Sequence, residues 1–181
     1  LPISAPDEDA RLAAELGTSA KDRAENLMIV DLMRNDLSRV CEAGSVRVPE
    51  LFKVETYANV HHLVSTVTGR MAQGRDALDL VAAAFPPGSI TGTPKLRAME
   101  ILGAQEGEPR GAYCGAIGWI GDAAHAMDLN VMIRTLTLDR DGEAWRVSGR
   151  SGGAITIDSD PEDEYAETLA KASALKRAVT G

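Results

Sequence analysis

The segment from Ser19 to Arg39 restricts what this chain can fold into more than any other part of the sequence. Ser19 is a typical helix N-cap, and Asp22 takes the third position of the turn that follows. The centre of the segment is apolar on almost every side of a helix, through Leu27, Met28, Ile29, Val30, Leu32 and Met33. A helix of this kind is buried in a globular protein. We therefore predict a buried helix over residues 19–39.

The other patterns alternate between helix and strand signals. Apolar spacing predicts four further helices, over residues 7–16, 76–85, 95–104 (with Pro94 at its first position) and 161–179. Strand patterns cover residues 46–54, 60–69, 112–121, 126–139 and 143–150. The last three predict an antiparallel meander with Asp141-Gly142 as a hairpin turn, and residues 86–94 are expected to form a loop. This order indicates an α/β (α+β) fold without internal repeats, and residues 1–181 are expected to be one domain or part of one.

Composition and charge narrow the class of protein. The 181 residues are 44% hydrophobic and 25% charged, as in an ordinary globular protein with one substantial core. A net charge of −8 argues against nucleic acid or an anionic membrane surface as partner. An anionic ligand would need a metal or a few placed Arg and Lys side chains. No membrane-spanning stretch or signal peptide is evident, and two unpatterned cysteines favour a reducing, cytoplasmic setting.

Two pairs of carboxylates stand three residues apart in predicted helices: Asp22 with Glu25, and Glu164 with Glu167. At this spacing both members of a pair project from one helix face, where their like charges repel. A hard cation relieves the repulsion, and Mg²⁺ is held by one or two carboxylates together with substrate oxygens. Two such helices could hold one metal ion. The alternative is a solvated helix face, because Glu25 and Glu167 each have a lysine four residues away.

Three further features suit an anionic ligand, and each has a structural alternative. Ser89–Lys95 leads into a helix N-terminus, where free N–H groups attract anions, although a simple capped turn has the same pattern. Ser151–Ala154 is a candidate cradle of backbone amides or else a bend. Arg134 follows an apolar run on a strand suited to burial, so it needs a ligand carboxylate or an internal Asp or Glu.

His61 and His62 are neighbours on a predicted strand. Their side chains therefore face opposite sides, and at most one points into any given site. A buried histidine is more often a hydrogen-bonded core residue than a catalyst, so the pattern leaves both roles open.

The motifs together resemble those of the chorismate-binding enzymes, in that family's order and over essentially all 181 residues. The matching segments are Ser19-Ala-Lys-Asp-Arg-Ala-Glu-Asn-Leu-Met-Ile-Val-Asp-Leu-Met-Arg-Asn-Asp36, Val60-His-His-Leu-Val-Ser65, Phe85-Pro-Pro-Gly-Ser-Ile-Thr-Gly-Thr-Pro-Lys95, Tyr113-Cys-Gly-Ala-Ile-Gly118, Ile133-Arg134, Gly152-Gly-Ala154 and Asp163-Glu-Tyr-Ala-Glu-Thr168. The resemblance implies mostly antiparallel sheets sandwiched by helices. Residues 1–181 would be the C-terminal part of a single catalytic domain.

The resemblance implies a metal site and a catalytic histidine. Glu25 and Glu167 match the family's Mg²⁺ ligands, and Glu164 is a further carboxylate of that site. Asp22 matches a catalytic-site carboxylate that holds water or substrate. His62, which is followed by Leu-Val-Ser, matches the active-site histidine near the ring that reacts.

Substrate-binding residues follow from the same resemblance. Tyr113 and Arg134 match the residues that hold the enolpyruvyl carboxylate of chorismate. The residues whose main-chain groups match substrate-binding loops are Thr91, Gly92, Gly152, Gly153 and Ala154. Chorismate is a dianion, and its ring carboxylate suits Mg²⁺, so the implied ligand fits an acidic protein that carries a metal.

Two motifs resemble the aminodeoxychorismate branch of the family. The sequence reads Leu-Met-Arg-Asn-Asp and Ser-Ile-Thr-Gly, where the anthranilate branch usually reads Leu-Ala-Arg-Asn-Asp and Thr-Leu-Ser-Gly. The resemblance implies Mg²⁺-dependent amination of chorismate to 4-amino-4-deoxychorismate, towards 4-aminobenzoate and folate. The ammonia would come from glutamine through an amidotransferase subunit or fused domain. Anthranilate synthase activity is the alternative enzyme function.

One family motif is missing from the sequence. The Pro-Ile-x-Gly-Thr motif does not occur, and in the aminodeoxychorismate branch its variable residue is a lysine implied as the nucleophile. The chain also begins at Leu1 rather than at Met. We therefore expect a piece of the catalytic domain, and a folded but inactive fragment is the alternative from a different class.

Overall fold

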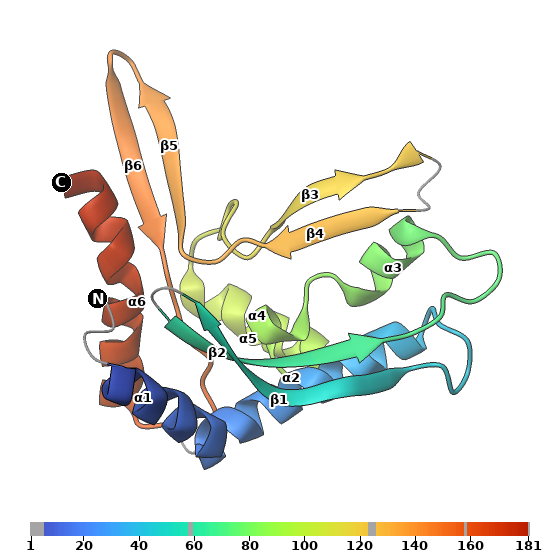
Figure 1. Cartoon of the computed structure of the whole chain (residues 1–181). Coiled ribbons are helices and arrows are strands. Elements are labelled where there is room, and N and C mark those ends of the chain that lie inside the picture. The colour runs from blue at the N-terminus through green and yellow to red at the C-terminus, as the bar shows by residue number, and fades with distance from the viewer. Residues whose placement is uncertain (1–5, 58–59, 123–125, 158, 181) are drawn as a thin grey trace. The chain divides into compact units, whose positions relative to one another are not determined.

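The computed structural model describes residues 6–57, 60–122, 126–157 and 159–180, so Leu1 lies outside the described part (Figure 1). The helices are α1 (Pro6–Thr18), α2 (Ala20–Ser38), α3 (Ala77–Ala84), α4 (Gly88–Thr91), α5 (Lys95–Glu106) and α6 (Pro161–Thr180). The strands are β1 (Arg47–Tyr57), β2 (Val60–Thr68), β3 (Ala116–Ile120), β4 (Met127–Val131), β5 (Thr135–Asp141) and β6 (Ala144–Arg150). The strands pair as antiparallel hairpins among helices, which confirms the predicted α+β class.

The chain divides into two compact units, Leu1–Gly88 and Ser89–Gly181. The first contains α1, α2, α3 and the β1–β2 hairpin. The second contains α5, α6 and the hairpins β3–β4 and β5–β6. Among the described helices, none is both long and apolar enough to cross a membrane.

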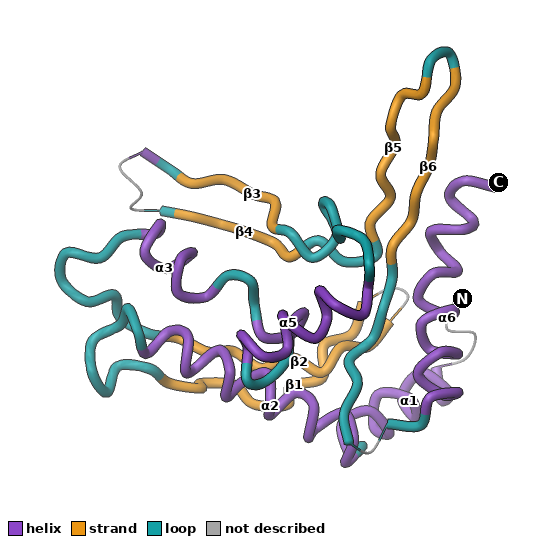
Figure 2. Tube along the Cα trace, turned by 180° about the vertical axis from the view of Figure 1, so that it is seen from behind, coloured by secondary structure: helices purple, strands orange, loops and turns teal. Residues whose placement is uncertain are grey.

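In the first unit, α2 lies along the β1–β2 hairpin (Figure 2). The strands pair from Tyr57 opposite Val60 back to Arg47 opposite Thr68. Between the pairs Glu50–Thr66 and Lys53–Val64, two residues of β1 face only Ser65 on β2. This extra residue is a β-bulge, which bends a strand and leaves a backbone group without its ladder partner.

An N-cap and a partly buried face hold α2 in the first unit. The Asp22 N–H donates to the Ser19 hydroxyl at 3.2 Å, which confirms the predicted N-cap. Val30 and Leu32 are buried, whereas Leu27 is 45% exposed, so the helix is less completely covered than its sequence predicts. A Cβ on Gly88 would lie 2.6 Å from Leu32 Cδ1. Glycine at this position therefore lets the start of α4 pass close to α2.

The core of the first unit lies beyond the C-terminus of α2. Its buried members are Val40, Cys41 and Ala83. The half-buried side chains that pack against them are Leu37, Val46, Met71 and Leu80. Cys41 also pairs with Met71 as an isolated bridge, which joins the segment after α2 to the segment after β2.

The predicted three-stranded meander in the second unit is wrong. Residues 126–139 form two strands, and β3–β4 and β5–β6 are separate two-stranded sheets. The break falls after Val131, where the Met132 N–H donates to the Gly115 carbonyl and Arg134 adopts a left-handed φ of 49°. A left-handed φ departs from the regular extended backbone of a strand, and β4 and β5 belong to different two-stranded sheets. The apolar alternation runs across the break, so the sequence pattern does not reveal it.

The helices of the second unit follow the sequence more closely. The predicted loop 86–94 contains the single turn α4, and Pro94 is the N-cap of α5 rather than its first residue. α5 ends at Gly107, which has φ 68°, a usual helix end for glycine. α6 matches the predicted helix, and its Leu175 lies 3.8 Å from a Cβ position on Gly149 of β6.

Candidate functional site

Asp22 lies at the junction of α1 and α2 in the first unit. It lines a pocket of about 330 Å³ together with Glu15, Leu16, Thr18 and Ser19. Its place in the first turn of α2 favours a negative charge, because the free N–H groups and the helix dipole are positive there. The pocket therefore sets one predicted catalytic-site carboxylate in an open hollow.

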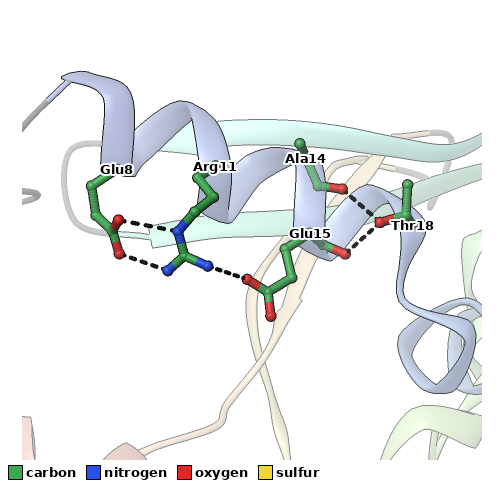
Figure 3. A network of polar contacts seen from close by, with 5 residues as sticks. All are labelled: Glu8, Arg11, Ala14, Glu15 and Thr18. Carbon is green, nitrogen blue, oxygen red and sulfur yellow. Dashed lines mark hydrogen bonds and ion pairs between the residues drawn. The ribbon is translucent and has the colours of Figure 1, made fainter.

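The wall of this pocket on α1 is held by polar contacts (Figure 3). Arg11 donates to Glu8 at 2.7 and 3.1 Å and to Glu15 at 3.0 Å. The Thr18 hydroxyl donates to the carbonyls of Ala14 and Glu15. The hydrogen bond and charge of Arg11 hold the pKa of Glu8 below its ordinary value. These are solvated i,i+3 and i,i+4 contacts, so they support α1 and form no site by themselves.

The two histidines of β2 face different surroundings, as predicted. The His61 side chain is only 7% exposed, and its Nε2 lies 2.7 Å from Asp9 Oδ1. Its Nδ1 lies 2.9 Å from the Thr56 hydroxyl. His62 is exposed, and the Tyr57 ring meets it edge-on at 5.5 Å. His61 thus has a structural role in joining α1 to the hairpin, while His62 is the histidine that a ligand can reach.

In the second unit, the predicted loop residues Thr91 and Gly92 follow one another at the end of α4. Gly92 has φ 128°, and a Cβ there would lie 3.1 Å from Ala98 Cβ on α5. This conformation is unfavourable for residues other than glycine. Arg110 stabilises the loop, because its guanidinium donates to the Ile90 carbonyl at 2.8 Å.

Arg110 is itself fixed by α5. It donates to both carboxylate oxygens of Glu106 at 2.6 to 3.1 Å, and this hydrogen bond raises the pKa of Arg110 above its ordinary value. The same contact lowers the pKa of Glu106. The pair therefore stays ionised and ties the Thr91–Gly92 loop to the end of α5.

Tyr113 stands in a tight turn before β3. Burial raises the pKa of its phenol, and the neighbouring Cys114 raises it further. The turn is closed by the Gly115 N–H donating to the Ala112 carbonyl at 3.0 Å, with Cys114 left-handed at φ 65°. A Cβ on Gly152 would lie 3.0 Å from the Tyr113 hydroxyl oxygen. Two predicted substrate-binding residues, Tyr113 and Gly152, are thus in contact range.

Arg134 differs from its prediction in one respect. It was expected on a strand suited to burial, but it is exposed and occupies the break between β4 and β5. Its guanidinium makes no ion pair with any residue in the described part of the chain. The internal Asp or Glu partner is therefore absent within that part, and a ligand carboxylate stays a prediction.

Ser151–Ala154 runs from β6 towards α6, past the second carboxylate pair. A Cβ on Gly153 would lie 3.5 Å from Glu164 Oε2 and 3.7 Å from Lys171 Nζ. Gly152 and Gly153 therefore bring Tyr113 and the α6 carboxylates to the same four-residue segment. Ala154 is half-buried beside them. The Ser151 hydroxyl oxygen is buried and has no hydrogen-bond partner among the described residues.

Glu164 and Glu167 stand one turn apart on α6, as predicted. Glu164 is 8% exposed, and its Oε1 accepts from the Ser159 hydroxyl at 2.7 Å. Glu167 Oε1 lies 2.5 Å from Lys171 Nζ. This is the i,i+4 contact that the sequence offers as the alternative to a metal ligand; the side chains of Lys171 and Glu167 are 28% and 46% exposed, and Lys171 also adjoins Gly153. It adds a cation to the cluster.

The donor set suits Mg²⁺ in its chemistry. Carboxylate oxygens are the ligands that this hard ion prefers, and it uses only one or two of them with water or substrate. Within the described residues, no group of three or more His, Cys, Asp or Glu side chains is placed so that it could hold a metal ion. Glu164 and Glu167 lie on α6 in the second unit and Glu25 lies on α2 in the first, so their joint role as Mg²⁺ ligands stays a prediction.

Sequence reasoning missed the residues that position this cluster. Ser159 and Lys171 contact the α6 carboxylates, whereas Arg110 holds the separate Thr91–Gly92 loop. Sequence spacing encodes only the contact of Lys171, which is four residues from Glu167 on one helix face. That spacing is the available sequence signal, and it predicts a surface pair. On α2, Asn26 donates to a carbonyl of β2 and was likewise missed.

The family assignment rests on comparison of the whole sequence. The family model described as chorismate binding enzyme matches residues 3–177, which is nearly the entire chain. The chain belongs to the chorismate-binding enzyme family. The resemblance of the sequence motifs is thereby confirmed.

Relatives within this family come from two branches. The chain is 52% identical to aminodeoxychorismate synthase component 1 of Escherichia coli over 170 residues, which is 94% of this chain and 36% of the relative. It is 49% identical to anthranilate synthase component 1 of Streptomyces coelicolor over 174 residues, 96% of this chain and 33% of the relative. The chain spans about a third of the length of these relatives, and their identities are close.

Solved structures of the family share the fold. Anthranilate synthase component I from Streptococcus pneumoniae matches with a TM-score of 0.77 and 39% identity, over 93% of this chain and 38% of that one. A putative 2,3-dihydroxybenzoate-specific isochorismate synthase from Bacillus anthracis matches with a TM-score of 0.76 and 29% identity, over 96% and 45%. The fold is therefore that of chorismate-binding enzymes.

Proposed function

We propose that the protein aminates chorismate to 4-amino-4-deoxychorismate as the component I activity of an aminodeoxychorismate synthase. The observation that carries the choice of substrate is the family match over residues 3–177. The choice of the aminodeoxychorismate branch rests on the sequences of Leu32–Asp36 and Ser89–Gly92. It also rests on several relatives named aminodeoxychorismate synthase component 1, at about 50% identity. In this reaction the ring C–O bond at position 4 breaks, a C–N bond forms, and the hydroxyl leaves as water.

The predicted site residues would have the following roles in this reaction. Tyr113 and Arg134 bind the enolpyruvyl carboxylate, Arg134 through two parallel N–H donors. His62 stands near the ring and exchanges a proton at the leaving hydroxyl. Asp22 holds water or substrate beside it. The main-chain groups that line the substrate are those of Thr91, Gly92, Gly152, Gly153 and Ala154.

Glu25, Glu164 and Glu167 would hold Mg²⁺. When bound, the ion offsets the charge of the ring carboxylate and polarises the leaving oxygen. Lys171, whose ammonium lies 2.5 Å from Glu167, adds positive charge near the proposed ligands for an anionic substrate. The ammonia would be supplied from glutamine by an amidotransferase subunit or fused domain, in a cytoplasmic route to 4-aminobenzoate and folate.

The test is a product assay of the full-length protein. With chorismate, Mg²⁺ and ammonium at high pH, it should form 4-amino-4-deoxychorismate and release no pyruvate. Stoichiometric pyruvate together with fluorescent anthranilate would instead assign anthranilate synthase activity. That is the second candidate, because relatives of that name are nearly as similar.

A polypeptide limited to residues 1–181 should be inactive in the same assay. It carries the proposed metal and substrate residues, but the Pro-Ile-x-Gly-Thr motif with its implied nucleophile does not occur in it. Turnover by this polypeptide would contradict the proposal that the catalytic domain extends beyond these residues.

A further inference from the structure

A chain of hydrogen bonds joins α2 to both strands of the β1–β2 hairpin. The Asn26 side-chain NH₂ on α2 donates to the Leu63 carbonyl on β2 at 2.9 Å. The Ser65 hydroxyl on β2 donates to Asn26 Oδ1 at 2.5 Å. The Phe52 backbone N–H on β1 donates to the same hydroxyl at 3.0 Å. We refer to Asn26, Ser65 and the Phe52 N–H as the α2–hairpin relay.

The bulge in β1 explains why this relay exists. Leu51 and Phe52 together face Ser65, and Phe52 has a left-handed φ of 58°. That conformation is an outlier for a bulky residue and occurs where surrounding contacts hold it in place. Here Ser65 satisfies the Phe52 N–H, and the Arg23 guanidinium covers the Phe52 ring at 4.5 Å. The strained residue is thus held from both β2 and α2.

The chemistry of the relay is specific to an amide at position 26. Its NH₂ must donate to a carbonyl while its oxygen accepts from a hydroxyl. A carboxylate could accept from Ser65, but it has no donor for Leu63. An apolar residue would leave the Leu63 carbonyl and the Ser65 hydroxyl without these partners in a half-buried place. The bonds therefore tie the Asn26 turn of α2 to Leu63 and Ser65 of β2.

The relay lies among three proposed active-site groups of the first unit. Glu25 immediately precedes Asn26, and Asp22 is four residues before it on the same helix face. His62 immediately precedes Leu63, whose carbonyl accepts the Asn26 bond. Each of these three residues is therefore either next in sequence to a residue of a relay bond or one helical turn away from it.

We infer that Asn26 and Ser65 are positioning residues that hold the Asp22–Glu25 turn of α2 in register with His62 on β2. This role rests on the proposed function, because it assigns Glu25 to Mg²⁺ and His62 to the ring. In this role neither residue contacts substrate. They act through the segments that carry the acting groups, in the way that outer-shell partners orient metal ligands.

The test uses the full-length protein and two independent readouts. Mn²⁺ stands in for Mg²⁺, and its dissociation constant is measured without substrate. The Mg²⁺ concentration for half-maximal chorismate consumption is measured alongside, with kcat and KM separated. Asn26→Ala and Ser65→Ala should each weaken Mn²⁺ binding about 10-fold. The double variant should lose little more, because both residues belong to one relay.

Two controls separate positioning from general stability. Ser65→Thr keeps the hydroxyl and should retain the wild-type Mn²⁺ affinity. Ser38→Ala removes a hydroxyl of α2 that donates to the Asn35 carbonyl at 2.7 Å, away from the relay, and should leave both readouts unchanged. If Asn26→Ala and Ser65→Ala lower the melting temperature but keep Mn²⁺ affinity and the Mg²⁺ midpoint within twofold of wild type, the inference is overturned.

The two proposals fail in different ways. A wild-type protein that binds Mn²⁺ but does not consume chorismate refutes the proposed function, and the dissociation constants of the variants then decide the positioning role. A wild-type protein that consumes chorismate without binding Mn²⁺ or needing Mg²⁺ overturns the positioning role alone. A protein that does neither overturns both.

Discussion

Gly152 lies so close to the Tyr113 hydroxyl that a side chain at this position would press against it. A Cβ there would approach that oxygen to 3.0 Å, so the phenol would have to move by a few tenths of an ångström. If Tyr113 binds the enolpyruvyl carboxylate, Gly152→Ala should raise KM for chorismate by about 10-fold, since small displacements of positioning groups are costly. Steady-state kinetics of the full-length protein measure this change.

Gly103→Ala is the matched control for this substitution. Gly103 lies inside α5, and nothing is within 4 Å of its Cβ position. Alanine there should leave KM unchanged and raise stability by about 0.5–1 kcal/mol, because alanine is the better helix former. Equal effects of the two variants on KM would mean that the contact between Gly152 and Tyr113 has no part in binding.

Arg134 is the second test of substrate binding at the residue scale. It is exposed and has no ion pair with another described residue, so its charge is not used inside that part of the chain. Arg134→Lys should weaken chorismate binding by about 1–3 kcal/mol, because an ammonium cannot reproduce the planar two-bond fork. Equilibrium binding of chorismate measures it. Unchanged affinity would remove Arg134 from the substrate site.

Among the elements, α1 contacts both strands of the hairpin, and one of these contacts involves the covered His61 side chain. Asp9 on α1 faces His61 Nε2 at 2.7 Å, and the imidazole is almost fully covered. Asp9→Ala leaves this nitrogen unpaired and should lower the free energy of unfolding by about 1–3 kcal/mol. Asp7→Ala, an exposed change in the same helical turn, should shift it by no more than about 0.5 kcal/mol. Urea unfolding of both variants compares them, and equal losses would show that His61 does not hold α1.

The helices and strands also show which structural features sequence patterns can predict. α2 has an N-cap signal, α2 and α6 both have sustained helical patterns, and the bounds predicted for each agree with the structure within one or two residues. The split of residues 126–139 was not predicted, because it depends on a left-handed Arg134 and on a bond from Met132 to Gly115. The bulge at Phe52 has the same cause, since Ser65 and Asn26 on other elements hold it. Local patterns carry periodicity, whereas these features are set by contacts distant in sequence.

The candidate site residues likewise fall into two groups: those that sequence motifs identify and those that only the contacts in the structure reveal. Glu164, Glu167 and the glycines of Ser151–Ala154 could be named from motifs, and the structure brings them together in the second unit. Lys171 and Ser159, which contact those carboxylates, could not be assigned from motifs. Their roles depend on which rotamers α6 and the preceding segment bring together.

For the whole molecule, the net charge of −8 means that any added cation should stabilise the folded state to some extent. Added salt screens the repulsion among carboxylates and raises stability without any specific site. Mg²⁺ bound at Glu25 and Glu167 would add to this effect, because a ligand that binds only the folded state stabilises it by mass action. The two contributions can be separated by comparing Mg²⁺ with a monovalent salt at equal ionic strength.

We therefore expect Mg²⁺ to raise the melting temperature of the full-length protein beyond the shift from NaCl at matched ionic strength. At 100 times its dissociation constant the ion should add about 2.7 kcal/mol of stability. Glu25→Gln or Glu167→Gln should remove the Mg²⁺-specific increment and keep the part due to salt. Glu143→Gln, in the exposed turn between β5 and β6, should keep both. A Mg²⁺ increment that survives in either of the first two variants would show that the substituted glutamate is not a ligand, whatever reaction the enzyme catalyses.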